Sequence, residues 1–331
     1  MSDTTRRRLI TLLGGTAAAW PLAVSAQGPA IPVVGFINGG SADASGPLMA
    51  AFRKGLNETG FVDGQNVRVE YHWLEGKYDQ LPALIADLVS RRVALITTPA
   101  ATPAARAAKA ATATIPIVFG VAQDPVQIGL VASLARPGGN ATGINFFNRE
   151  VTAKRLRLLH DLVPKAVRVA VLLNPAKSGS AEGTLREVQE AGPAIGLRIQ
   201  ILNATTIAEI NGAFASFAHE RPDALFIAPD GFFQDRRVQF ATLTARDRIP
   251  AAGAESPFVK AGGLMSYGTD LAETSRQVGD YSGKILKGAK PAELPVLQST
   301  KFEFALNLQT ARALNIEVPP GLLAIADEVI E

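Results

Sequence analysis

Small polar side chains gather where the predicted strands of this chain end. Nine of them follow a predicted strand or begin the helix after it: Asn38, Ser41, Thr98, Thr102, Asp124, Asn174, Asp230, Ser266 and Tyr267. Hydroxyl and amide groups orient polar ligands, and a helix N-terminus offers free amide groups to an anion. The same residue types also cap helices and form turns, so each residue alone has an ordinary structural explanation.

The groups that most enzymes use for catalysis are scarce. The chain has no cysteine, and its three histidines, His72, His160 and His219, show no metal-ligand spacing. A Gly-x-Ser-x-Gly elbow, a P-loop and a Gly-x-Gly-x-x-Gly fingerprint are also missing from the sequence. We therefore predict no catalytic residue, no metal site and no cofactor.

The first 26 residues have the composition of a signal peptide. Arg6, Arg7 and Arg8 precede a short apolar run, and small residues stand at Val24 and Ala26. The arginines resemble a twin-arginine export signal. Glycines and a proline interrupt the apolar run, which makes an uncleaved membrane anchor the weaker alternative. We expect cleavage before Gln27 and a periplasmic protein, monomeric and without a lipid anchor.

The composition of the chain limits the kinds of partner that the protein is expected to bind. The chain has 331 residues, of which 47% are hydrophobic, enough for two domains with cores of their own. The predicted leader holds three arginines and one aspartate, so the remainder carries a net charge of +1. This balance gives no electrostatic reason to expect a nucleic-acid partner. A small molecule is the expected ligand.

Short β-rich runs alternate with helical patterns along the chain. Val93 to Thr97 and Ile115 to Val121 read as buried strands, and Leu48, Phe52 and Leu56 mark one face of a helix. The rhythm repeats from about residue 146, which predicts two doubly wound α/β lobes with parallel sheets.

The expected lobe boundaries follow from breaks in this rhythm. We expect an N-terminal lobe of 30–145 plus about 251–297 and a C-terminal lobe of 146–250 plus about 298–331. The Pro- and Gly-rich segment 136–143 is the expected first crossover. In open parallel sheets, ligands bind beyond the carboxyl ends of the strands, where the polar residues gather.

Several stretches resemble one family, the ABC transporter substrate-binding proteins of the tryptophan-binding-like type. The resemblance rests on these segments: 10–15, 18–23, 51–56, 64–67, 78–84, 115–119, 124–126, 129–131, 136–140, 142–143, 302–308, 310–311 and 326–330. It implies a type I periplasmic-binding fold with three crossovers and a cleft between the lobes. It also implies delivery of a small polar solute to an ABC permease in the inner membrane, and some relatives bind aromatic amino acids.

By this resemblance, the polar residues at the strand ends become candidate ligand contacts. Thr98 and Thr102 flank a helix start that could hold a carboxylate, and Asp124 or Asp230 could pair with an ammonium group. No arginine stands at these strand ends, which argues against a bidentate arginine clamp. Two alternatives remain open: an exported α/β enzyme such as a hydrolase, and a ligand-sensing module for a membrane receptor.

Overall fold

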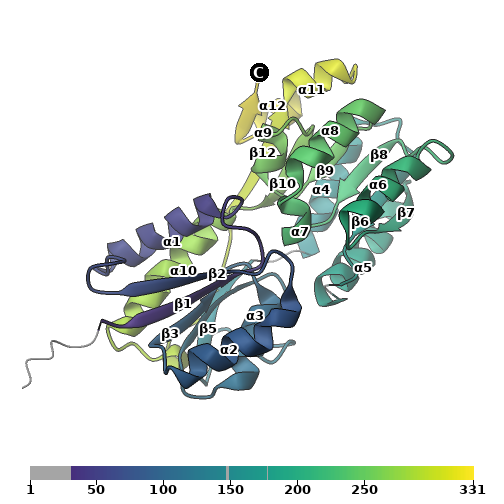
Figure 1. Ribbon diagram of the computed structural model, residues 1–331. Helices are drawn as coiled ribbons and strands as arrows, with labels where there is room; N and C mark the ends of the chain where they lie inside the picture. Colours follow the sequence, from purple (N-terminus) through teal and green to yellow (C-terminus); the bar gives the residue numbers. More distant parts are fainter. Residues whose placement is uncertain (1–30, 147–148, 177) are drawn as a thin grey trace, which may run out of the picture. The chain divides into compact units, whose positions relative to one another are not determined.

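The computed structural model describes residues 31–146, 149–176 and 178–331 (Figure 1). The predicted signal peptide, 1–26, lies outside the described residues. Within the described part of the chain, the helices are too short or too polar to cross a membrane.

The first sheet has six strands, all parallel, in the order β11-β5-β4-β3-β1-β2. Their bounds are β1 Val33–Asn38, β2 Arg68–Trp73, β3 Leu95–Thr98, β4 Ile117–Val121, β5 Ala141–Asn145 and β11 Leu297–Gln298. Every residue of β3, β4 and β5 is buried. Strands β3 and β4 begin with apolar runs in the sequence, as expected where helices cover both faces of a sheet.

The second sheet has seven strands in the order β13-β12-β10-β9-β8-β6-β7. Their bounds are β6 Arg168–Leu173, β7 Arg198–Asn203, β8 Ala224–Ile227, β9 Ala251–Gly253, β10 Met265–Thr269, β12 Phe302–Asn307 and β13 Glu328–Ile330. β12 runs antiparallel to β10, and the other neighbours are parallel. The two sheets together confirm the predicted doubly wound α/β class.

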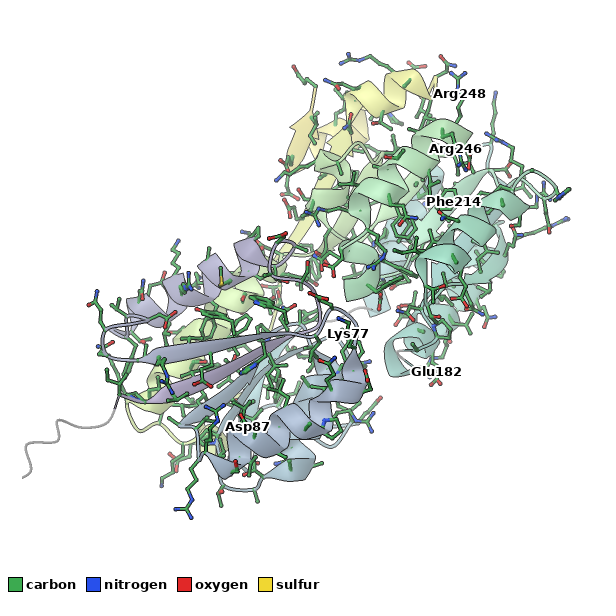
Figure 2. The ribbon with its side chains drawn as sticks, viewed as in Figure 1. Lys77, Asp87, Glu182, Phe214, Arg246 and Arg248 are labelled. Atoms are coloured by element: carbon green, nitrogen blue, oxygen red, sulfur yellow. The ribbon has the colours of Figure 1, made fainter. Side chains whose placement is uncertain are left out.

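Helices cover both faces of each sheet and bury their apolar stripes there. They are α1 Gly46–Glu58, α2 Leu81–Ser90, α3 Thr102–Ala111, α4 Arg149–Leu162, α5 Ser178–Ala194, α6 Ile207–Ser216, α7 Gly231–Gln234, α8 Arg237–Asp247, α9 Ser256–Lys260, α10 Leu271–Leu286, α11 Leu308–Ala313 and α12 Pro320–Ala324. Short 3₁₀ turns occupy Tyr78–Gln80 and Pro291–Glu293. Charged side chains such as Asp87 and Arg246 stay exposed, whereas Phe214 is buried in the core beside the second sheet (Figure 2).

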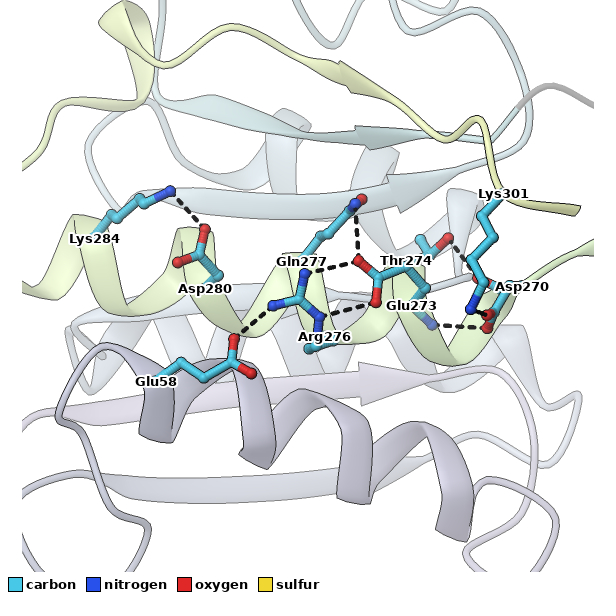
Figure 3. Close-up of polar contacts among 9 residues, drawn as sticks. All are labelled: Glu58, Asp270, Glu273, Thr274, Arg276, Gln277, Asp280, Lys284 and Lys301. Atoms are coloured by element: carbon cyan, nitrogen blue, oxygen red, sulfur yellow. Dashed lines mark hydrogen bonds and ion pairs between the residues drawn. The ribbon is translucent and has the colours of Figure 1, made fainter.

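Helix α10 follows a strand of the second sheet but packs on α1, over the first sheet (Figure 1). Glycines allow the close approach: a side chain at Gly55 would meet the carbonyl oxygen of Arg276, and one at Gly279 that of Phe52. The Arg276 guanidinium then pairs with Glu58 of α1 at 2.5 Å and with Glu273 at 2.7 Å (Figure 3).

The sheets match the expected lobe boundaries near 145 and 298, but the chain returns to the first sheet at another point than the sequence predicted. Segment 136–143 is not the first crossover, because Ala141–Asn145 form β5 and pair with β4. The expected return at about 251 is also wrong, since β9 and β10 belong to the second sheet. The carbonyl of Pro250 accepts the N–H of Leu225 at 2.8 Å, so this proline directly precedes a paired strand and does not mark a break between the lobes. The return lies between Thr269 and Leu271, and the last crossing between Gln298 and Phe302.

Candidate functional site

A cavity of about 280 Å³ lies at the carboxyl ends of strands from both sheets. Its polar lining comes from Asn38, Tyr78, Thr102, Arg106 and Gln123 on one side and from Asp230, Gln234 and Glu255 on the other. Its apolar lining includes Leu48, Phe146, Pro229 and Leu271. The site therefore combines apolar walls with a few polar groups, the usual composition of a small-molecule pocket.

Asn38, the last residue of β1, shapes the loop at the edge of the cavity. Its Oδ1 accepts the backbone N–H of Gly40 at 2.8 Å and the hydroxyl of Ser45 at 3.1 Å. Gly39 next to it leaves room for Tyr78, whose hydroxyl would clash with any side chain at that position. The sequence Asn38-Gly39-Gly40 thus holds an aromatic ring at the cavity wall.

The N-terminus of α3 faces the cavity through Thr102 and Pro103. Ala101, at the N-cap position, has no side chain that could accept the N–H groups of the first turn. Ala100 has a φ of 57°, a left-handed conformation that costs an alanine about 1 kcal/mol. Arg106 lies one turn further along α3, so this side of the cavity combines a helix N-terminus with a positive charge.

Asp230 and Asn174 join two neighbouring strands of the second sheet. The Asn174 amide donates to Asp230 Oδ1 at 3.2 Å, and the N–H of Phe233 donates to the same oxygen at 3.1 Å. Asp230 therefore caps α7 while its side chain also lines the cavity. Asn174 itself is 7% exposed, and it contributes to the cavity only by orienting the carboxylate of Asp230.

Glu255 is a second carboxyl group on this side of the cavity, between β9 and α9. The side-chain amide of Gln234 donates to it. Burial raises the pKa of Glu255 to about 7, and the positive charges of Arg155 and Arg237 oppose that rise. Arg155 is itself buried: its Nε donates to the carbonyl of Tyr267 at 2.5 Å and its guanidinium lies 5.2 Å from the ring centre of Phe226.

A narrow recess of about 40 Å³ lies in the second domain, beside this part of the cavity. Its apolar wall includes Ile227, Phe233, Phe240 and Phe258. Asp230, Gln234 and Glu255 line both the recess and the cavity, so these three polar side chains stand where the two spaces meet.

Of the nine residues predicted from the sequence, three line the cavity: Asn38, Thr102 and Asp230. Asn174 reaches it only through Asp230. Ser41 instead donates its N–H and hydroxyl to Asp235 Oδ1 at 3.3 and 3.1 Å. Asp124 accepts the backbone N–H groups of Val126 and Gln127, as a turn-forming aspartate does.

The remaining three predicted residues also lie outside the cavity lining. Thr98 and Ser266 are buried within their strands, with 0% and 1% exposure. Tyr267 turns its ring toward Phe302 and Phe304, with ring centres 6.0 and 6.3 Å apart. Parallel strand ends predict the right edge of the sheet, but the alternation of side chains decides which residues reach the ligand space.

The nine predicted residues leave out five polar lining residues: Tyr78, Arg106, Gln123, Gln234 and Glu255. Glu255 carried a usable signal, because it follows a predicted strand in the segment Ala254-Glu255-Ser256. Arg106 did as well, since it stands four residues after Thr102 and so on the same face of α3. Tyr78 and Gln234 lie in short helical segments that no periodic pattern reveals.

The histidines play no part in the cavity lining. Burial lowers the pKa of His72, which is half-buried in β2. Among the residues that the structure describes, no cluster of three or more His, Cys, Asp or Glu side chains could hold a metal ion.

Two parallel-sheet α/β domains with a ligand-sized cavity at their strand ends define a solute-binding protein of the type I periplasmic-binding fold. The sequence profile of the family described as ABC transporter substrate binding protein matches residues 30–330, and the chain belongs to this family. Proteins of this family bind solutes outside the cytoplasm for ABC transporters. The predicted resemblance, fold and function are thereby confirmed, and the enzyme and sensor alternatives are not favoured.

Similar proteins agree with this assignment. A tyrosine-binding protein of Clostridioides difficile is 26% identical over 266 residues, which cover 80% of this chain and 76% of that protein. The crystal structure of an ABC domain in complex with L-Trp from Streptococcus pneumoniae has a TM-score of 0.79 at 24% identity and covers 90% of this chain and 99% of its own. A ligand-free, open substrate-binding protein with adhesive properties from Clostridium difficile has a TM-score of 0.65 at 26% identity, over 91% and 99% of the two chains.

Proposed function

We propose that this protein binds an aromatic amino acid, with L-tyrosine and L-tryptophan as the first candidates, and delivers it unchanged to an ABC permease. One observation carries the proposal: the cavity has a basic side and an acidic side separated by apolar walls. Arg106 and the α3 N-terminus supply the first, and Asp230 and Glu255 supply the second. A zwitterion with an apolar side chain complements this arrangement.

The α-carboxylate of the ligand fits the N-terminus of α3. The partial positive charge of a helix N-terminus favours an anion, and the first turn of α3 lacks a side-chain cap that would compete for its N–H groups. Arg106 adds a full positive charge on the same helix.

The α-ammonium group fits Asp230. This carboxylate is held in place by the Asn174 amide and by the N–H of Phe233, so its direction is fixed before a ligand arrives. Pre-organised partners lose little conformational entropy on binding, which favours affinity.

The size of the cavity suits an aromatic ring. An apolar cavity of about 150 Å³ in another protein holds benzene, and this cavity of about 280 Å³ has room for a backbone as well. Leu48, Phe146 and Leu271 offer apolar contact to the ring. The 26% identical tyrosine-binding protein supports the same ligand class.

Isothermal titration of the purified protein with L-tyrosine, L-tryptophan, L-leucine and L-glutamate tests the proposal. We expect the aromatic amino acids to bind at least ten times more tightly than the others, and we expect a higher melting temperature with them present. Mass spectrometry of the recovered ligand checks that it is unchanged. Tighter binding of a non-aromatic solute, or conversion of the ligand, would contradict the proposal.

We further propose that the protein works in the periplasm as a monomer after export through residues 1–26. The Arg6-Arg7-Arg8 sequence and the small residues before Gln27 support export by a cleaved, twin-arginine-like signal. N-terminal sequencing of the protein from a periplasmic extract should begin at Gln27. Light scattering with and without ligand measures the oligomeric state, and co-purification with the permease tests the partner.

A further inference from the structure

We propose that Glu255, held by Gln234, recognises a hydrogen-bond donor on the ring of the ligand and so excludes phenylalanine. The donor would be the hydroxyl of tyrosine or the indole N–H of tryptophan. This inference rests on the proposed function and extends it from a class of ligands to a rule of selection within that class.

Two carboxyl groups, Asp230 and Glu255, line the acidic side of the cavity, whereas the ammonium group of an amino acid carries one positive charge. Asp230 is oriented by two donors from its own domain and serves the ammonium group. A tyrosine or tryptophan brings a second donor on its ring, and Glu255 is the acceptor available for it. A phenylalanine brings none.

Glu255 and Gln234 stand, together with Asp230, where the cavity meets the apolar recess. The recess, at about 40 Å³, is far smaller than a cavity of roughly 150 Å³ that is known to hold benzene, so we expect an aromatic ring to remain outside it. A ring that lies along the apolar wall therefore stops at this junction, with its outer edge beside Glu255.

The surrounding positive charges keep Glu255 a hydrogen-bond acceptor. Arg155, buried behind the site, and Arg237, in the wall of the recess, both favour the ionised carboxylate. The amide of Gln234 donates to the same carboxyl group and fixes its direction. Burial opposes ionisation and raises the pKa of Glu255 to about 7, so a donor from the ligand stabilises an anion that the protein alone stabilises incompletely.

The protein should discriminate against phenylalanine because binding it would desolvate the Glu255 carboxylate without a compensating hydrogen bond. When an apolar ring edge covers a buried carboxylate without donating to it, the carboxylate loses its water and gains nothing in return. Sites built to hydrogen-bond a ligand group reject analogues that lack it far more strongly than apolar pockets reject a missing methylene. We therefore expect phenylalanine to bind at least about 100-fold more weakly than tyrosine.

The experiment is titration calorimetry at pH 8 with L-tyrosine, L-tryptophan and L-phenylalanine. In the Glu255→Leu variant, the tyrosine-to-phenylalanine affinity ratio should fall from about 100 or more to below about 5, mainly because phenylalanine binds better. Asp230→Asn should weaken all three ligands by similar factors and leave the ratio unchanged. Glu303→Gln is the matched control, because Glu303 is another carboxyl group whose pKa burial raises, outside the cavity lining.

Each outcome separates the two proposals. Equal affinity of the wild-type protein for tyrosine and phenylalanine, or an unchanged ratio in Glu255→Leu, overturns the role of Glu255 and leaves the proposed function standing. Failure of all three amino acids to bind overturns the proposed function itself. If Glu255→Leu does not fold, Gln234→Leu takes its place, since loss of the residue that orients Glu255 should reduce the ratio at least fivefold.

Discussion

Asn174 donates its side-chain amide to the carboxylate of Asp230 at 3.2 Å, so the ends of the neighbouring strands β6 and β8 are tied by one hydrogen bond. The same Asp230 oxygen caps α7. Asp230 is thus both a structural cap and a cavity-lining charge, and a substitution must separate the two roles to reveal either.

Asp230→Asn makes that separation. The asparagine oxygen can still accept the N–H of Phe233, so the free energy of unfolding should change by less than about 1 kcal/mol. Loss of the negative charge should weaken binding of L-tyrosine by about 10- to 100-fold, which is the effect of losing a charged hydrogen bond of about 1.5 to 3 kcal/mol. Calorimetry and urea unfolding measure the two effects. Equal losses of binding energy and stability would identify Asp230 as a cap alone.

The proposed contact between the ligand's carboxylate and the α3 side of the cavity can be tested with a ligand that lacks the carboxylate. Tyramine, which lacks the carboxylate, should bind at least tenfold more weakly than L-tyrosine to the wild-type protein. Arg106 is exposed at the cavity, so Arg106→Ala should weaken L-tyrosine by about fivefold, within the range of screened ion pairs. The same variant should leave tyramine affinity unchanged. A similar loss for both ligands would show that Arg106 does not face the carboxylate.

Stability should depend on pH through Glu255. The pKa of Glu255 is about 7 in the folded protein and 4.5 as its ordinary value. Between these values the folded protein holds a proton that the unfolded chain has released, so the free energy of unfolding falls as the pH rises from about 4.5 to 7. One pKa unit corresponds to about 1.4 kcal/mol, which gives a fall of about 3 kcal/mol from this group.

Glu255→Gln removes the titration and isolates this effect. We expect the difference in unfolding free energy between wild type and variant to favour the variant increasingly up to pH 7 and then to level off. Urea unfolding at pH 4.5, 6 and 7.5 measures it, and other titrating groups cancel in the difference. A difference that does not vary with pH would contradict the raised pKa.

The sequence predicted the fold better than the site. Buried runs such as Ile115 to Val121 and stripes such as Leu48, Phe52 and Leu56 report burial directly, because apolar periodicity is a local property. Glu255 and Arg106 reach the cavity only because β9 joins the second sheet and α3 packs on the first. The pairing of the short strand β9 depends on distant partners, so the sequence placed it in the wrong lobe and its site residue was overlooked.

The helix crossing of α1 and α10 gives a test of packing. Gly55→Ala would normally stabilise an α-helix, but here the added methyl group would meet the carbonyl oxygen of Arg276. A backbone atom cannot rotate away, so the helices must separate, and we expect a loss of about 2 kcal/mol or more in the free energy of unfolding.

Gly212→Ala is the matched control: this glycine lies inside α6 with no atom within 4 Å of the added group. It should gain about 0.5 to 1 kcal/mol. Urea unfolding of both variants measures the contrast, and a stabilised Gly55→Ala would show that the two helices are not in contact there.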